Sequence, residues 1–249
     1  MSRTLNQNIE DKTKYEIGAD ITLSQEWYSD DVRKTGGQNG APEGVGVETE
    51  IIKKNFREPN FDSYKTLDGI KKATKVYTNI EGKMEIGVET IHNLTIQGII
   101  PHEFGEVAWF KNGLLPYHWY NYLNLLAEAP NAFLVSSDIH TTHGVELGDF
   151  IGISWGGQDY LTGVVYGFID YWPSYNPIID KEKQSLVVAN LSYLHNKMAK
   201  EPYEVWLKKE EGATESLVYK SIQDKELDIL SIDSTSQELI KKKNDSLLK

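Results

Sequence analysis

Cysteine is absent from the 249-residue sequence, which excludes disulfide bonds, thiol nucleophiles and cysteine-ligated metal sites. No apolar run reaches the ~20 residues that a membrane-spanning helix requires, so we expect a water-soluble chain. Met1 is followed directly by polar residues, and we therefore expect no signal peptide. Basic residues are scarce: 26 Lys and Arg stand against 37 Asp and Glu, for a formal net charge of −11. This balance disfavours a nucleic-acid-binding surface, whose electrostatic footprint is basic.

Hydrophobic residues make up 39% of the chain, enough for a packed core in one large domain or two small ones. Period-two alternation and helical spacing indicate a mixture of strands and helices. We predict strands at 17–23, 47–53, 75–79, 131–136, 148–155, 161–172, 203–209 and 227–233, with two more within 84–100. Helices are predicted at 2–16, 62–67, 102–110, 116–130, 138–144, 192–200, 213–223 and 234–249. The polar stretch 29–46, which contains the glycine-rich segment 36–46, is predicted to be a mobile loop.

The two ends of the chain carry the same kind of unit, a strand followed by a helix and a second strand. One unit lies in the first 80 residues and the other spans 203–233. The middle of the chain is richer in strands. This layout predicts an α+β fold in which one lobe is built from both termini and a β-rich lobe is inserted between them.

Residues that could support catalysis occur in incomplete patterns. His102, Glu103 and Glu106 come close to a zinc-protease helix, but a carboxylate stands where the second histidine would bind the metal. His140 and His143 have the spacing of one helical turn, without a third ligand nearby in the sequence. Neither a phosphate-binding loop nor a G-x-S-x-G nucleophile motif occurs. These patterns favour solvated surface residues over a catalytic centre.

Aromatic residues are the most informative feature, with 6 Trp and 14 Tyr. They gather in the segments YHWYNY and YWPSYNP, and a cluster of such amphipathic side chains can bind a glycan, a peptide or a protein. The candidate binding residues are Trp119, Tyr120, Tyr171, Trp172 and Tyr175. The alternative is that the same residues form the core or the seam between the lobes, and the sequence favours this alternative.

Several segments, in their order along the chain, resemble one family: RTLNQNIEDKTKYEIGADITL, EFGEVAWF, LLPYHWYNYLNLLAE, DYWPSYNP, PYEVWLKKEEGATESLVYKSIQ and STSQELIKKKNDSLL. Over nearly its whole length the chain resembles the extracytoplasmic domain of FtsX-like, MacB-type ABC transporter permeases of Gram-positive bacteria. The resemblance implies a two-lobed MacB-like periplasmic core domain. Residues 1–80 and 190–249 would form a membrane-proximal, porter-like α+β lobe, and residues 81–189 the β-rich distal lobe. Ser2–Tyr15 and Ser234–Lys249 would be stalks that rise from two transmembrane helices.

The resemblance also implies a domain that is not an enzyme and that carries no cofactor and no metal. ATP would be hydrolysed by a cytoplasmic ABC ATPase, reached through the full-length permease, and motion would pass along the stalks. The implied location is the extracytoplasmic side of the cell membrane. A peptide, lipid or protein is the expected partner there, and the full transporter is expected to be a dimer of an otherwise monomeric domain. Two alternatives stay open: a secreted glycan- or peptide-binding module that uses the Trp/Tyr cluster, and a metal-dependent hydrolase.

Overall fold

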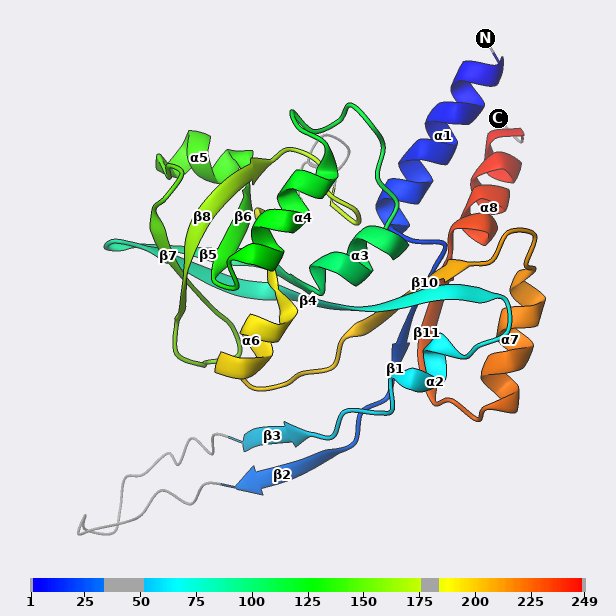
Figure 1. Cartoon of the computed structure of the whole chain (residues 1–249), viewed down its shortest axis with the longest axis horizontal. Coiled ribbons are helices and arrows are strands. Elements are labelled where there is room, and N and C mark those ends of the chain that lie inside the picture. Colours follow the sequence, from blue (N-terminus) through cyan, green and yellow to red (C-terminus); the bar gives the residue numbers. More distant parts are fainter. Residues whose placement is uncertain (1, 34–51, 176–183, 248–249) are drawn as a thin grey trace.

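The computed structural model of the chain describes residues 2–33, 52–175 and 184–247 (Figure 1). Helices and strands are mixed along the chain, which confirms the predicted α+β class. The helices are α1 (Ser2–Ile17), α2 (Asp62–Lys65), α3 (Pro101–Val107), α4 (Trp119–Glu128), α5 (Ser137–His143), α6 (Leu191–Lys197), α7 (Glu215–Asp224) and α8 (Thr235–Leu247). The strands are β1 (Ile21–Gln25), β2 (Ser29–Arg33), β3 (Ile52–Phe56), β4 (Ile70–Ile86), β5 (Glu89–Ile99), β6 (Ala132–Ser136), β7 (Phe150–Ser154), β8 (Leu161–Ile169), β9 (Leu186–Asn190), β10 (Glu204–Lys209) and β11 (Ile229–Ser234).

Four strands at one end of the main sheet lie in the order β11-β1-β10-β4, and we call this part the open section. Its neighbouring strands are all antiparallel. The order interleaves the two predicted units, β1-α2-β4 and β10-α7-β11, so that β1 lies between the two strands of the other unit. This is the split β-α-β arrangement of ferredoxin-like folds. Interleaving therefore builds the first and last parts of the described chain into one sheet.

The rest of the sheet closes on itself, and we call it the ring. From β4 the order continues through β5, β9, β6, β8 and β7, and β7 pairs with β4 again. Two of the pairs, β5–β9 and β6–β8, are parallel, and the others in the ring are antiparallel. Closure leaves the ring without a free strand edge, whereas the open section ends at β11.

Strand β4 belongs to both parts. Its first residues pair with β10 of the open section, and its last residues pair with β7 of the ring. Between these sections its register with β5 shifts between Asn79 and Gly82. Because such a bulge inverts the alternation of faces, Tyr77 before it and Met84 after it both join the same buried cluster. The predicted lobe boundary after Ile80 falls within this bulge, and the division into two lobes stays a prediction.

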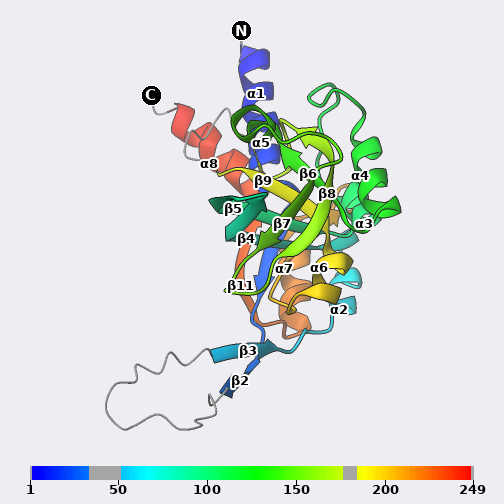
Figure 2. The same ribbon diagram turned by 90° about the vertical axis from the view of Figure 1, so that its left-hand side faces the viewer.

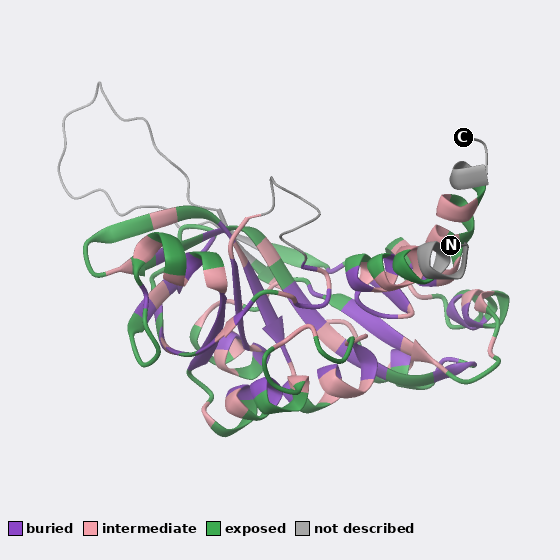
Figure 3. Ribbon diagram, turned by 90° about the horizontal axis from the view of Figure 1, so that it is seen from above, coloured by how far each residue is buried: buried purple, intermediate pink, exposed green. Residues whose placement is uncertain are grey.

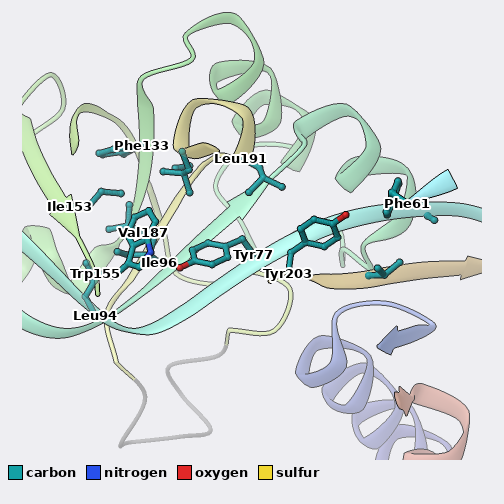
Figure 4. Packing of buried hydrophobic residues seen from close by; sticks show 14 of the residues in the cluster. Phe61, Tyr77, Leu94, Ile96, Phe133, Ile153, Trp155, Val187, Leu191 and Tyr203 are labelled. Carbon is teal, nitrogen blue, oxygen red and sulfur yellow. The ribbon is translucent and has the colours of Figure 1, made fainter. Parts of the chain in front are cut away.

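The larger buried cluster runs through both parts of the sheet. Inside the ring it contains Phe133, Ile153 and Val187, and beside the open section it contains Phe61, just before α2, and Tyr203, just before β10 (Figure 4). Side chains of α2 and α7 cover the same face of the open section. The face that these two helices cover is therefore continuous with the interior of the ring.

The opposite face of the sheet is covered by α3 and α4. A second buried cluster forms there, in which Phe104 of α3 and Leu126 of α4 pack with Val76 and Trp206 of the strands. Viewed from above, buried residues concentrate on the central strands (Figure 3). The sheet thus has a hydrophobic cluster on each face, and α3 lies over β4 and β10, where the ring meets the open section.

One prediction about the segment after β1 is wrong. Ser29–Arg33, predicted as part of a loop, is strand β2 and pairs with β3 to form a separate two-stranded ladder. Strands that do not cover the main core need no apolar face, and SDDVR accordingly lacks the apolar alternation by which a strand is recognised in a sequence. The glycine-rich segment 36–46 lies outside the described residues, as does most of the predicted strand 47–53.

Candidate functional site

The helices at the two ends of the described chain lie side by side. Figures 1 and 2 both show α1 and α8 projecting from the same side of the sheet, away from the β2–β3 ladder. The cause is the pairing of β1 with β11: Ile21, the first residue of β1, is opposite Ser234, the last residue of β11. Antiparallel neighbours place the start of one strand next to the end of the other. The chain therefore enters and leaves the sheet at one point.

Helix α8 is attached directly to the open section. It begins at Thr235, immediately after β11 ends, so no loop separates strand from helix. The Thr235 hydroxyl donates a hydrogen bond to the carbonyl of Ala19 at 2.7 Å, and its backbone N–H donates to Asp20 at 3.1 Å. Both acceptors lie in the short link between α1 and β1. Thr235 is buried, so loss of these bonds would leave polar groups unsatisfied.

Ion pairs join the two helices along their length. Lys242 of α8 pairs with Glu16 of α1, and Lys243 pairs with Glu10 at 2.9 Å. The hydrogen bond from Lys243 holds the pKa of Glu10 below its usual value. All four side chains are partly exposed, so the pairs align the helices and contribute little to stability.

The C-terminal end of α1 is fixed by a tight turn. Gly18 has φ +89°, a left-handed conformation that favours glycine, and its N–H bonds the carbonyl of Lys14 to close the helix. A Cβ atom at this position would lie 2.4 Å from the Trp206 ring of β10, so only glycine fits. Two residues later, the Asp20 carboxylate accepts a hydrogen bond from the backbone of Lys209 at 2.9 Å. These contacts set the direction in which α1 leaves the sheet.

Loops from the ring side also contact the end of α1. The Trp109 N–H donates to the Gly18 carbonyl at 2.7 Å, and the Ser174 N–H donates to the Tyr15 carbonyl at 2.7 Å. The Tyr15 and Trp109 rings meet edge to face, with centroids 5.1 Å apart. Lys111, which follows Trp109 closely, forms an ion pair with Asp11 of α1 at 2.6 Å.

Two of the five predicted aromatic binding residues lie in the core. Trp172 is fully buried, and Tyr175 is 4% exposed. The Trp172 ring stacks on Phe104 at 5.8 Å, and its N–H donates to the side chain of Gln97 at 2.8 Å. Phe104 also contacts Trp206, so aromatic side chains from α3, β10 and the segment after β8 meet at one place. Trp172 and Tyr175 are therefore packed in the core.

The other candidates lie at or near the surface. Trp119 is half-buried and stacks on Phe110 at 4.7 Å, and Phe110 in turn contacts Trp172. Tyr120 stacks on Trp119 at 4.2 Å and is 47% exposed, and Tyr171 is half-buried. A pocket of about 250 Å³ lies beside this stack, and its lining includes Lys111, Tyr117, His118 and Trp119.

A charged cluster ties the segment before α2 to the sheet. The Glu58 carboxylate accepts hydrogen bonds from Lys75 at 2.5 Å, Tyr203 at 2.9 Å and Lys200 at 3.2 Å. Burial alone would raise the pKa of Glu58, but these three bonds outweigh it and lower the pKa to about 2. The ammonium of Lys75 also lies over the rings of Phe61 and Tyr203. Glu58 is therefore ionised at any ordinary pH and holds the cluster together.

The histidines and acids considered as metal ligands are dispersed. The Nδ1 atom of His140 lies 2.7 Å from the Val145 carbonyl, whereas that of His143 lies 2.8 Å from Glu89. Glu106 pairs with Lys72. In the part of the chain that the structure describes, no three His, Asp or Glu residues gather as a metal site would require. None of the described helices combines the length and apolar character needed to cross a membrane.

No protein-family model and no curated protein sequence matches the chain. Among solved structures, the periplasmic region of MacB from Actinobacillus actinomycetemcomitans has a TM-score of 0.50 and 12% sequence identity, covering 96% of this chain and 98% of that chain. The chain has the MacB periplasmic fold. The extracellular domain of the noncanonic ABC-type transporter YknZ from Gram-positive bacteria is also similar, with a TM-score of 0.42 and 15% identity over 64% of this chain and 74% of that chain. The predicted resemblance is confirmed at the level of the fold.

Within this MacB-like fold, sequence reasoning missed the residues that fix α1. Gly18 separates a polar helix from an apolar alternation, which is the sequence signal of a helix end, and it could have located the joint. Ser174, whose N–H bonds the Tyr15 carbonyl, carries no such signal, because a loop serine looks like any other in the sequence. Its role follows only from this contact.

Proposed function

We propose that the chain is the extracytoplasmic domain of an ABC transporter permease and that it acts mechanically, without catalysing a reaction. The observation that carries the proposal is the placement of α1 and α8, which leave one point of the sheet side by side. Such a pair suits a domain inserted between two transmembrane helices, because both connections then face the same membrane. The MacB-like fold supports this reading.

In this proposal, ATP is hydrolysed by a cytoplasmic ATPase that binds the full-length permease, and two copies of the permease form the transporter. Closure of the ATPase moves the membrane helices, and α1 and α8 carry that motion to the sheet outside the membrane. At ~1.5 Å per residue, the 16 residues of α1 extend about 24 Å. A helix of this length transmits displacement of its base as long as its hydrogen-bond ladder is intact.

The open section and the ring are the two lobes of this proposal, with the division near the β4 bulge. The half-exposed aromatic surface around Trp119, Tyr120 and Tyr171 is the proposed contact for an extracytoplasmic partner. It lies on the face that carries α4 and beside the loop that contacts α1. Motion of α1 would therefore reach this surface through few intermediates.

The experiment that tests the proposal places a proline in α1 of the full-length permease. Ile9→Pro removes a backbone donor from the middle of the helix and kinks it, which costs about 3 kcal/mol locally. We expect transport to be lost while ATPase activity persists and the domain stays folded. Ile9→Ala, which keeps the helix, is the matched control and should transport normally. Normal transport by the Ile9→Pro permease would overturn the mechanical proposal.

A further inference from the structure

The two helices enter the fold differently. Helix α8 contacts α1, the α1–β1 link and the open section, where Gln237 donates a hydrogen bond to Tyr219 of α7 and Ser236 accepts one from Lys209 of β10. Thr235 of α8 also bonds the α1–β1 link, and Lys242 and Lys243 pair with α1. Helix α1, by contrast, contacts the loops 108–118 and 170–175.

The first connection from α1 to the ring consists of two consecutive hydrogen-bond steps. The Tyr15 carbonyl at the end of α1 accepts a bond from the Ser174 N–H at 2.7 Å. The Ser174 hydroxyl in turn accepts a bond from the Gln97 amide at 3.0 Å, and the Gln97 oxygen accepts the bond from Trp172. Gln97 is 1% exposed and lies in β5, a wall of the ring. Buried bonds of this kind are costly to break, so they transmit displacement well.

Ser174 itself supports this reading. It has φ +66°, a left-handed conformation that costs a residue with a side chain free energy and that persists only when its surroundings hold it. Its N–H and its hydroxyl face two different partners, Tyr15 and Gln97. The strained serine thus sits between α1 and the ring wall.

The second connection uses the loop after α3. Trp109 bonds Gly18 and packs on Tyr15, and the ammonium of Lys14 lies 5.4 Å from the centre of the Trp109 ring. The next residue, Phe110, stacks on Trp119 and meets Trp172 edge to face at 5.3 Å. The contact of Tyr15 with Trp109 is therefore joined, through the backbone between Trp109 and Phe110, to the ring contacts that Phe110 makes with α4 and with the core.

We propose that α1 and α8 are two separate mechanical inputs. Through Ser174 and Trp109, α1 acts on the ring, whereas α8 acts on the open section. Sliding of one helix along the other then moves the ring relative to the open section. The sheet would bend at the β4 bulge, because strand pairing is least regular there. The mechanical role of the two helices rests on the proposed transporter function. Their separate coupling to the ring and to the open section can be measured on this chain alone.

The test uses hydrogen exchange of two reporter amides in the whole chain, followed by NMR. The Ser174 N–H reports the α1–ring connection, and the Thr235 N–H, which donates to Asp20, reports the α8–open-section connection. Trp109→Ala should speed exchange at Ser174 about tenfold, a loss of ~1.4 kcal/mol of local stability, with less than about a twofold change at Thr235. Thr235→Ala removes the hydroxyl bond to Ala19 and should give the reverse pattern.

A milder variant keeps the test decisive if Trp109→Ala fails to fold. Asp11→Asn removes the surface ion pair to Lys111, and it should raise exchange at Ser174 by about twofold with Thr235 unchanged. Equal acceleration of both amides in either variant would overturn the proposal of two inputs, as would an unchanged Ser174. Such a result leaves the proposed transporter function untouched, because that function is decided by Ile9→Pro in the permease.

Discussion

The open section and the ring protect their hydrogen bonds and cores in opposite ways. The ring satisfies its strand edges by closing β7 onto β4, and its interior is filled by its own side chains, Phe133 and Val187 among them. The open section relies on α2 and α7 to cover one face, and among the described residues its last strand, β11, has a partner strand, β1, on one edge only. A closed ring resists deformation, whereas an open sheet can twist. The part that carries both terminal helices is thus the more deformable one.

The open section and the ring are not independent, because they share a strand and two buried clusters. Strand β4 crosses from one to the other, and the larger buried cluster is continuous through both. The second cluster, on the opposite face, also joins Trp206 of the open section to Trp172 beside the ring through Phe104. We therefore expect the two parts to unfold together, while moving slightly against each other in the folded state.

The strongest way to break this expectation is to remove Trp172. Trp172→Ala deletes a fully buried indole side chain that joins both parts through Phe104, and we expect a loss of about 3–5 kcal/mol in the free energy of unfolding. Urea unfolding followed by circular dichroism should show one transition at lower urea. Tyr117→Ala, at a position 70% exposed, is the control and should change stability by less than about 0.5 kcal/mol. Two separate transitions would mean that the parts fold independently.

Acid should weaken the attachment of the α2 segment to the sheet. The pKa of Glu58 is about 2 in the folded chain and ~4.3 in an unfolded one, so its contribution of about 2–3 kcal/mol is complete above pH ~4.3. That contribution is lost as the pH falls through 4.3 toward 2, because the unfolded chain binds the proton first.

The measurement compares the free energies of unfolding of the wild type and Glu58→Gln at two pH values. The difference should be largest near neutral pH and should fall by about half at pH ~3. Glu211→Gln, in an exposed turn, is the control for the substitution itself and should change the free energy of unfolding by less than about 0.5 kcal/mol. A difference for Glu58→Gln that stays constant between the two pH values would contradict the assignment. We also expect a matching loss of hydrogen-exchange protection in α2 and the adjoining β10 at low pH, since Tyr203, which bonds Glu58, precedes β10 directly.

Local rules predicted the elements with strong signals. The helical spacing in PYHWYNYLNLLAEAP predicted the helix that became α4, and Tyr122, Leu123 and Leu126 are buried as that spacing requires. Gly144, predicted to end a short helix, has φ +67° at the C-cap of α5. These features depend on residues within a turn or two of one another, so the sequence contains all the information they need.

Features that depend on distant partners were not predictable in the same way. The alternation from Ile17 to Leu23 indicated one strand, but α1 continues through Ile17 and β1 begins only at Ile21. Leu217 is as apolar as its neighbour Val218, yet it is 43% exposed, because the sheet lies under Val218 and Ile222. Strand β9 was missed, since its parallel pairing with β5 joins segments about 90 residues apart.

The burial of the aromatic candidates also depends on distant partners. Composition indicated a cluster but could not separate Trp172, which is fully buried, from Tyr120, which is 47% exposed. Both occur in tyrosine-rich segments of similar character. What separates them is the position of α3, whose Phe104 covers Trp172 and leaves the start of α4 at the surface.

The smallest expected effect concerns the helix pair itself. Replacing Lys242 and Lys243 with Ala removes the ion pairs to Glu16 and Glu10, and we expect less than about 1 kcal/mol because the side chains are partly exposed. The loss should appear as faster hydrogen exchange in α8, without any change in the ring amides. Salt at about 1 M, which shortens the screening length to ~3 Å, should produce a similar acceleration in the wild type. Lys241→Ala, whose partner Glu238 lies within α8, should not affect α1. Acceleration that spread into the ring would mean that α8 also acts on it, and the difference between the two helices would be lost.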